Sequence, residues 1–238
     1  MKKTIDPIEP KEYSDDLLRC KVNSFVTAPR MLNQSMRRII AGSAEESFDK
    51  VLGYCLSKGW NDAIIRERFI TSSPIVTNAK CIIDSFGDKL KEEIKNASNS
   101  SGFVHSYDSW HNSMCSSKEY GMRYGIWQKF INMTLKYLYC FKDVRTVPDC
   151  IPWNDLHCPI DSVIAKQLLG LMQHDCIPDT RRIVESICFN GEYGVSWNSI
   201  AEEEYKHVQT IIANLCRRDS IPSKLFFDFI YWERQKNK

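Results

Sequence analysis

The chain has 238 residues, of which 43% are hydrophobic and 11% aromatic, so it can form either one large domain or two small ones. Its 32 Lys and Arg residues nearly balance its 30 Asp and Glu residues. The net charge of +2 excludes the overall basic surface of a protein that coats nucleic acid, so any contact with DNA is expected to be local.

The ten cysteines are scattered along the chain without the spacing of a disulfide framework, which predicts free thiols in a reducing compartment. The amino terminus lacks the apolar segment of a signal peptide, and no apolar run approaches the roughly 20 residues of a membrane span. These features predict a cytoplasmic protein that does not contact a membrane.

Apolar residues recur at intervals of three and four, whereas the alternation typical of strands is rare. The sequence therefore predicts an all-α fold with about nine or ten helices. Gly42 is expected to end one helix, and Ser43 with Glu46 forms a capping box for the next, which Gly59 is expected to end. The helices predicted in this part of the chain span 15–26, 31–42, 43–59 and 74–98.

A small polar segment, residues 96–103, is the candidate hinge between two halves. It separates an amino-terminal helical part, 1–100, from a second helical part, 101–238. The alternative is one continuous two-lobed domain. The helices predicted in the second part span 118–141, 159–173, 196–218 and 222–236, with a proline-containing loop after the first of them.

Three polar residues interrupt the apolar helix predicted at 118–141. Lys129, Asn132 and Lys136 stand at positions i, i+3 and i+7, so they share one face. In the simplest interpretation this stripe faces water, and Lys129 extends its amine to solvent. In the alternative, burial and a carboxylate partner tune the Lys129 amine to act as a nucleophile.

Asp161 is the candidate partner of Lys129. Pro159 marks a helix start and leaves Asp161 in the first turn, where the helix dipole favours an ionised carboxylate. Many such aspartates only cap their helix. Beside Lys129, however, Asp161 can accept the proton of the amine or stabilise a developing cation.

The sequences GIWQKFINMTLKYLYC (125–140) and CPIDSVIA (158–165) resemble the catalytic segment of the helix-hairpin-helix DNA glycosylases, most closely the archaeal 8-oxoguanine DNA glycosylase branch. The shared features are a Gln-Lys pair that opens an apolar helix and an aspartate shortly after a proline. The aspartate, Asp161, stands 32 residues after Lys129. The resemblance covers roughly residues 121–172. It implies a two-lobed helical fold in which Lys129 attacks C1′ of the damaged nucleotide and Asp161 assists.

Two features of the family pattern are absent from the sequence. Most members have Gly-x-Gly-x-Lys where this chain has Gly125-Ile126-Trp127-Gln128-Lys129, so the second glycine of a phosphate-binding nest is missing. The four-cysteine loop that holds an iron–sulfur cluster in some members is also missing. The remaining His and Cys residues fit no common zinc spacing, so we expect no metal and no other cofactor.

A base flipped out of DNA is held by stacking on aromatic faces and by hydrogen bonds along its edge. The residues predicted to line such a pocket are Asp108, Trp110, His111, Trp127, Met133, Trp153 and His157. Alternatively, the tryptophans belong to the core and the polar residues cap a turn. The candidate DNA contacts are Gly125, Gln128, Arg37, Arg38, Arg217 and Arg218, although such arginine pairs are also common on ordinary surfaces.

These features predict a monomeric DNA glycosylase, with β-lyase activity if the amine is the nucleophile, that acts on double-stranded DNA carrying a modified base. The substrate is either an oxidised purine, as the resemblance implies, or a bulky modified pyrimidine of the kind found in phage DNA, and the role is correspondingly repair or defence. The alternative is a helical module that binds nucleic acid or a partner without catalysis. Catalysis requires Lys129 Nζ and the Asp161 carboxylate to face one open cleft.

Overall fold

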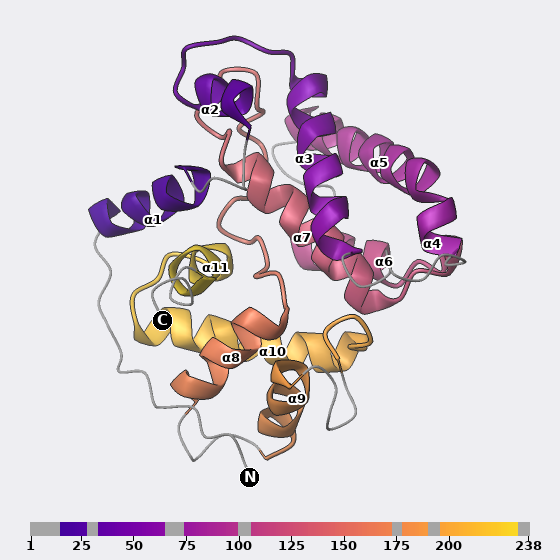
Figure 1. The fold of residues 1–238 in the computed structure, drawn as a ribbon, viewed down its shortest axis with the longest axis vertical. Coiled ribbons are helices and arrows are strands. Elements are labelled where there is room, and N and C mark those ends of the chain that lie inside the picture. Colours follow the sequence, from indigo (N-terminus) through magenta and orange to yellow (C-terminus); the bar gives the residue numbers. More distant parts are fainter. Residues whose placement is uncertain are drawn as a thin grey trace.

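The computed structural model describes residues 15–27, 33–64, 74–99, 106–172, 178–189 and 196–232. In these ranges the chain forms eleven α-helices and one short 3-10 helix, and it forms no strand (Figure 1). The predicted all-α class is therefore confirmed. The helices are α1 Asp15–Thr27, α2 Gln34–Ile40, α3 Phe48–Ala63, α4 Pro74–Thr77, α5 Ala79–Asn99, α6 Tyr107–Cys115, η2 Glu119–Gly121, α7 Tyr124–Tyr139, α8 Ser162–Leu171, α9 Pro178–Cys188, α10 Glu202–Arg218 and α11 Lys224–Trp232.

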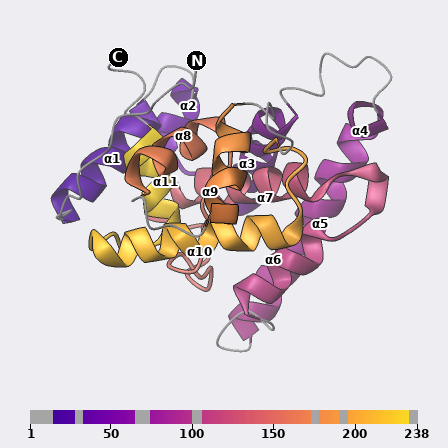
Figure 2. The same cartoon turned by 90° about the horizontal axis from the view of Figure 1, so that it is seen from below.

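Helix α7 is the central element, and every residue from Gly125 to Tyr139 is buried. It packs against α3 and α6. Figures 1 and 2 show α4 and α5 on one side of the molecule and α8, α9 and α10 grouped on the other. A helix that is surrounded in this way needs an apolar sequence around its whole circumference, which explains the nearly continuous apolar run of α7.

Gly59 of α3 packs directly against the backbone of α7. A Cβ atom added there would stand 2.8 Å from the backbone nitrogen of Thr134, so no larger residue fits without moving a helix. The sequence had predicted that Gly59 ends α3, but the helix continues to Ala63. The predicted capping box at Ser43 is also wrong, because α3 starts later and Ser47 caps it by accepting a hydrogen bond from the N–H of Lys50.

The apolar residues form two clusters, which meet at α11. The first contains residues of α2, α3, α5, α6 and α7, and the second contains residues of α8, α9 and α10. Leu225 and Phe229 of α11 belong to the first cluster, whereas Phe227, Ile230 and Tyr231 belong to the second. Because these positions alternate around one helix, α11 joins the two clusters by presenting a different face to each.

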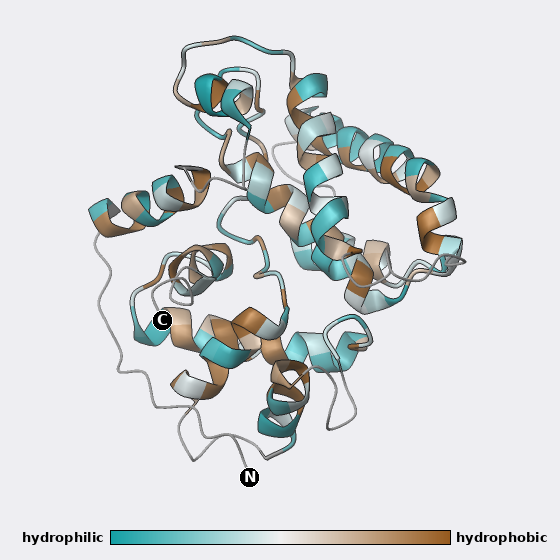
Figure 3. Ribbon diagram, in the orientation of Figure 1, coloured by the Kyte–Doolittle hydropathy of each residue, from teal (hydrophilic) through white to brown (hydrophobic). Residues whose placement is uncertain are grey.

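The surface helices show the expected separation of polar and apolar residues. In Figure 3, α5 alternates between hydrophilic and hydrophobic colours along its length. Its buried residues include Ile82, Phe86, Leu90 and Ile94, one per turn. The predicted domain boundary between residues 100 and 101 lies outside the described residues, so the division into two parts stays a prediction.

Two further findings concern the cysteines and the membrane. The nine cysteines of the described ranges are all free thiols. Within the same ranges, no helix combines the length and the apolar composition that crossing a membrane requires.

Candidate functional site

The structure brings together the two residues that the sequence proposed as a catalytic pair. Lys129 Nζ lies 3.0 Å from Asp161 Oδ2, across 32 residues of chain. The side chains are 9% and 17% exposed, so the pair is largely buried but retains contact with solvent. The stripe of Lys129, Asn132 and Lys136 does not face water, because all of its members are buried.

The carboxylate of Asp161 divides its two oxygens between two tasks. Oδ1 accepts hydrogen bonds from the backbone N–H groups of Val163 at 2.9 Å and Ile164 at 3.0 Å, while Oδ2 accepts from Lys129. The sequence had placed Asp161 in the first turn of α8, but the structure shows that it is the N-cap of this helix. The cap fixes the direction in which the second oxygen points.

Electrostatics favour the ionised form of this carboxylate. Burial alone would raise the pKa of Asp161, but the charge of Lys129 and the N–H groups of Ile164 and Val163 outweigh it and hold the pKa below its ordinary value. At neutral pH the pair therefore consists of a carboxylate and the lysine amine that donates to it.

Trp197 completes the surroundings of the amine, and sequence reasoning did not find it. Lys129 Nζ lies 4.5 Å from the centroid of the Trp197 ring, a distance typical of a cation–π contact. The backbone beside Trp197 packs on the first turn of α7, where a Cβ atom at Gly125 would stand 2.9 Å from the carbonyl oxygen of Asn198. Gly125 therefore allows a close backbone contact here.

The segment that precedes Asp161 is held by two glutamine side chains. Gln128 donates to the carbonyl of Ile160 at 3.0 Å and accepts from its N–H at 3.2 Å. Gln209 of α10 pairs in the same way with the backbone of Cys158, at 2.6 Å and 3.3 Å. Gln128, predicted as a DNA contact, is fully buried in this role.

Three of the predicted pocket residues form one polar cluster. His157 Nε2 lies 2.6 Å from Asp108 Oδ1, and the rings of His157 and His111 lie 4.6 Å apart, centroid to centroid. The hydroxyl of Tyr205 on α10 lies 2.9 Å from His157 Nδ1. Sequence reasoning missed Tyr205. No local pattern marks Tyr205, because its partners lie far away in the sequence.

The other predicted pocket residues are packed in the core or away from the lysine. Trp127 is 1% exposed, and its ring contacts Phe86 and Phe130. Trp110 is also buried and packs beside Phe86. The remaining two are Met133, buried one turn beyond Lys129 on α7, and Trp153, which packs edge-on against Tyr139.

The predicted arginine contacts lie on two separate helices. Arg37 and Arg38 are in the last turn of α2, and Arg217 and Arg218 are in the last turn of α10. Arg218 forms a two-point ion pair with Asp219, at 2.6 Å and 3.0 Å. Its charge is therefore partly neutralised.

Lys136, which shares a face of α7 with Lys129, has a different environment. It is wholly buried, forms an ion pair with Asp228 of α11, and lies 4.0 Å from the ring centroid of Phe25 and 4.9 Å from that of Phe229. Burial raises the pKa of Asp228, and Lys136 offsets only part of that effect. This pair joins α7 to α11 inside the core.

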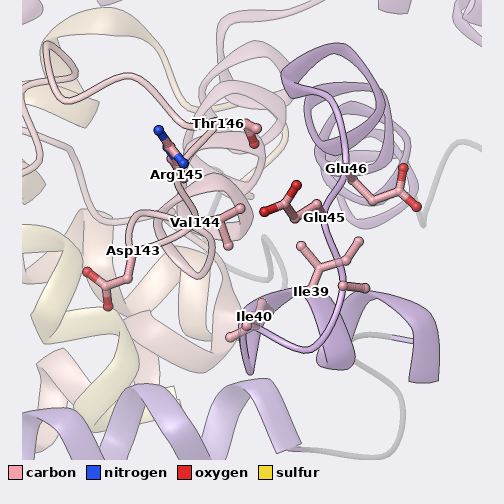
Figure 4. A pocket seen from close by; sticks show the side chains of 10 residues that line it. Ile39, Ile40, Glu45, Glu46, Asp143, Val144, Arg145 and Thr146 are labelled. Atoms are coloured by element: carbon pink, nitrogen blue, oxygen red, sulfur yellow. The ribbon is translucent and has the colours of Figure 1, made fainter.

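Two cavities lie near the other end of α7. One, of about 550 Å³, is lined by residues 39–46 and 143–146, and Figure 4 shows Glu45 directed toward Val144 across it. The second, of about 700 Å³, lies between α1, α11 and the end of α7. Its lining residue Cys140 is eleven positions beyond Lys129, or about 16 Å along the helix. Neither cavity contains the pair of Lys129 and Asp161.

Comparisons of the chain with protein-family models, curated proteins and solved structures found no match.

Proposed function

We propose that the protein is a DNA glycosylase in which Lys129 is the nucleophile and Asp161 assists it. The observation that carries the proposal is the contact of 3.0 Å between Lys129 Nζ and Asp161 Oδ2 at a site that keeps solvent access. An amine and a carboxylate at this distance are within the range for direct proton transfer. The resemblance of both segments to the helix-hairpin-helix glycosylases supports the same assignment of roles.

The reaction uses each group in turn. Asp161 takes a proton from the Lys129 ammonium, and the free amine attacks C1′ of the nucleotide. The N–C1′ bond forms as the glycosidic bond breaks, and the base leaves with the bonding electrons and takes the proton from Asp161, which is again a carboxylate. O4′ then leaves C1′ and takes a proton, which gives a protonated imine between Lys129 and the opened sugar. Loss of a proton from C2′ and of the 3′ phosphate completes the β-elimination.

Asp161 has a second role while the glycosidic bond breaks. The sugar carries positive charge at this stage, and a carboxylate held in a largely buried site stabilises such charge more strongly than one in water. Because Oδ1 is fixed by the N-terminus of α8, Oδ2 does not need to reorient during the reaction.

The substrate class stays open between an oxidised purine and a bulky modified pyrimidine such as those of phage DNA. Both are double-stranded DNA substrates with an altered base, and both require base flipping, because the amine cannot reach C1′ inside a stacked duplex.

A non-catalytic binding module is the second candidate, and one observation favours it. Lys129 belongs to α7, which packs in the first apolar cluster, and Asp161 caps α8, which packs in the second. In this candidate, the ion pair holds the two clusters together and takes no part in chemistry. Removal of either partner would then affect stability and not chemistry.

The experiment that separates the candidates uses a panel of duplex oligonucleotides, each with one modified base, and scores released base and abasic sites separately. We expect release from at least one duplex by the natural protein and none by Lys129→Gln. The control is Lys166→Gln, on the exposed side of α8, which should retain full release. Lys136 is unsuitable as a control because its ion pair with Asp228 is buried. Equal release by the natural protein and Lys129→Gln would exclude the lysine as nucleophile.

A further inference from the structure

A chain of hydrogen bonds runs from the backbone beside Asp161 toward the protein surface. The donor and the acceptor of each bond follow from the chemistry of the groups. The N–H of Ile160 can only donate, so the atom of Gln128 that lies 3.2 Å from it must be the amide oxygen. The same oxygen lies 3.3 Å from the side-chain nitrogen of Asn132, which donates to it. The amide groups of Gln128 and Asn132 therefore each have only one possible orientation.

The chain continues through Tyr205, because the side-chain nitrogen of Asn132 donates both to Gln128 and outward to Tyr205. The Asn132 nitrogen also donates to the Tyr205 hydroxyl at 2.8 Å, which leaves the hydroxyl hydrogen free to be donated onward. That hydrogen goes to His157 Nδ1 at 2.9 Å. His157 Nε2 then carries the ring proton and donates it to Asp108 at 2.6 Å. Asp108 is 67% exposed, so the chain ends in solvent.

Two side branches hold Asn132 in place. Its oxygen accepts from the Tyr107 hydroxyl at 3.3 Å and from His111 Nε2 at 3.1 Å. His111 thus has its proton on Nε2, and its Nδ1 faces the thiol of Cys115 at 3.6 Å. A buried polar network in which each donor meets an acceptor holds one arrangement of side chains.

We propose that this chain positions the Asp161 carboxylate for the reaction, with Tyr205 as the central positioning residue. The inference rests on the proposed function, since it assigns a task to residues behind Asp161. Tyr205 reaches Asp161 only through Asn132, Gln128 and the Ile160 peptide, so it acts at a distance from the reacting atoms. Through these hydrogen bonds, the position of Tyr205 on α10 determines the position of Asp161, the cap of α8.

Burial keeps His157 in the neutral form that the chain requires. The groups that face it are Tyr107, Asp108 and His111 on α6, Lys224 on α11, Tyr205 on α10, and Asp155 in its own loop. Burial lowers the pKa of His157, against the opposing effect of Asp108. A second proton on Nδ1 would meet the hydroxyl hydrogen of Tyr205 and break the chain at its middle.

Hydrogen exchange tests the chain without reference to activity. Tyr205→Phe removes the hydroxyl and keeps the ring, so the Ile160 amide, which donates to Gln128, should exchange at least about tenfold faster. Tyr137→Phe is the matched control, because its hydroxyl donates to Asp62 at 2.7 Å, outside the chain. Asp108→Ala changes only the exposed end and should give a smaller increase. Unchanged Ile160 exchange in Tyr205→Phe would overturn the proposal.

A double-mutant cycle tests whether the chain acts through Asp161. Tyr205→Phe should lower kcat about tenfold with little change in KM, and it should have no further effect in an Asp161→Asn background. Equal effects in both backgrounds would show a general structural role and overturn the positioning role. If the natural protein excises no base, the proposed function fails, whereas the Ile160 exchange result still decides whether the chain exists.

Discussion

Asp161 is the residue on which the site depends, because one side chain both starts α8 and faces the lysine. The N–H groups of Val163 and Ile164 hold Oδ1, and Lys129 holds Oδ2. Changes at this position can therefore separate shape from charge. Asparagine caps a helix about as well as aspartate but carries no charge, whereas alanine removes both properties.

The expected outcome for Asp161→Asn is nearly normal DNA binding with excision slower by about two to three orders of magnitude, since the charge that stabilises the transition state is lost. Asp161→Ala should lower the free energy of unfolding by about 1 kcal/mol more than Asp161→Asn does, because the cap is lost as well. Single-turnover excision and urea denaturation of both variants measure the two effects. Normal excision by Asp161→Asn would remove Asp161 from the mechanism.

The two buried histidines should make stability depend on pH. Burial lowers the pKa of His111 and of His157, so the unfolded state binds more protons than the folded state below the ordinary histidine pKa of about 6.5. Stability should be complete above about pH 6.5 and fall as the pH drops below it, by up to about 1.4 kcal/mol per pH unit for each histidine.

Urea denaturation at pH 7.5, 6.0 and 5.0 measures this dependence. His157→Gln should reduce the slope, while His207→Gln, at an exposed position on α10, should leave it unchanged. A free energy of unfolding that is the same at pH 5.0 and 7.5 would contradict the assignment of two neutral buried imidazoles.

At the scale of elements, two glycines of α3 provide a direct comparison of helix packing. At Gly59 an added Cβ would stand 2.8 Å from the Thr134 nitrogen and 3.0 Å from the Phe130 carbonyl oxygen, whereas at Gly53 it would meet nothing within 4 Å. Gly59→Ala should therefore destabilise the protein by about 1–3 kcal/mol. Gly53→Ala should stabilise it by about 0.5–1 kcal/mol, because alanine is the better helix former.

Thermal unfolding of the two variants decides the point. A Gly59→Ala protein as stable as the natural one would mean that α3 and α7 are not in close contact at Thr134.

The sequence predicted most of the helices but not α6 or α9. The long apolar run through Lys129 predicted α7, and Pro159 with Asp161 predicted the start of α8. Helix α6 was not predicted, because its nine residues, YDSWHNSMC, are too few and too polar to show a clear apolar period. The start of α3 was misplaced because Ser43 and Ser47 both precede a helical pattern, and only the tertiary structure shows that Ser47 is the cap.

The candidate site, like the helices, could be predicted from the sequence only in part. The pairing of Lys129 with Asp161 was predicted from two motifs, but the roles of Trp197 and Tyr205 were not. These residues approach the site from outside the resembling segments, and their contacts depend on how the helices pack. Two of the three tryptophans assigned to the base pocket, Trp110 and Trp127, instead fill the core, as their large apolar rings favour.

In the molecule as a whole, the ion pair of Lys129 and Asp161 links a helix of one apolar cluster to a helix of the other. α7 brings the lysine from the first cluster and the cap of α8 brings the aspartate from the second. The net charge of +2 gives this molecule little general attraction to DNA. In the proposed function, DNA binding therefore relies on a few local contacts, such as the arginine pairs of α2 and α10.

DNA affinity should accordingly fall with salt, but with a shallow slope. About three phosphate contacts would weaken binding about fortyfold between 50 and 200 mM salt, compared with a thousandfold or more for proteins with six or more contacts. Fluorescence anisotropy with a labelled duplex across this range gives the slope. Affinity that does not change with salt would argue against DNA as the partner.

In the proposed reaction, the Lys129 amine forms a covalent bond with the sugar of the damaged nucleotide. Borohydride reduces an imine to a stable amine, so reduction during the reaction on a processed duplex should trap a protein–DNA adduct. Peptide mapping of this adduct should place the DNA on Lys129, and Lys129→Gln should give no adduct while Lys166→Gln gives the normal amount. An adduct that maps to another residue, or base release by the Lys129→Gln protein at the natural rate, would contradict the claim.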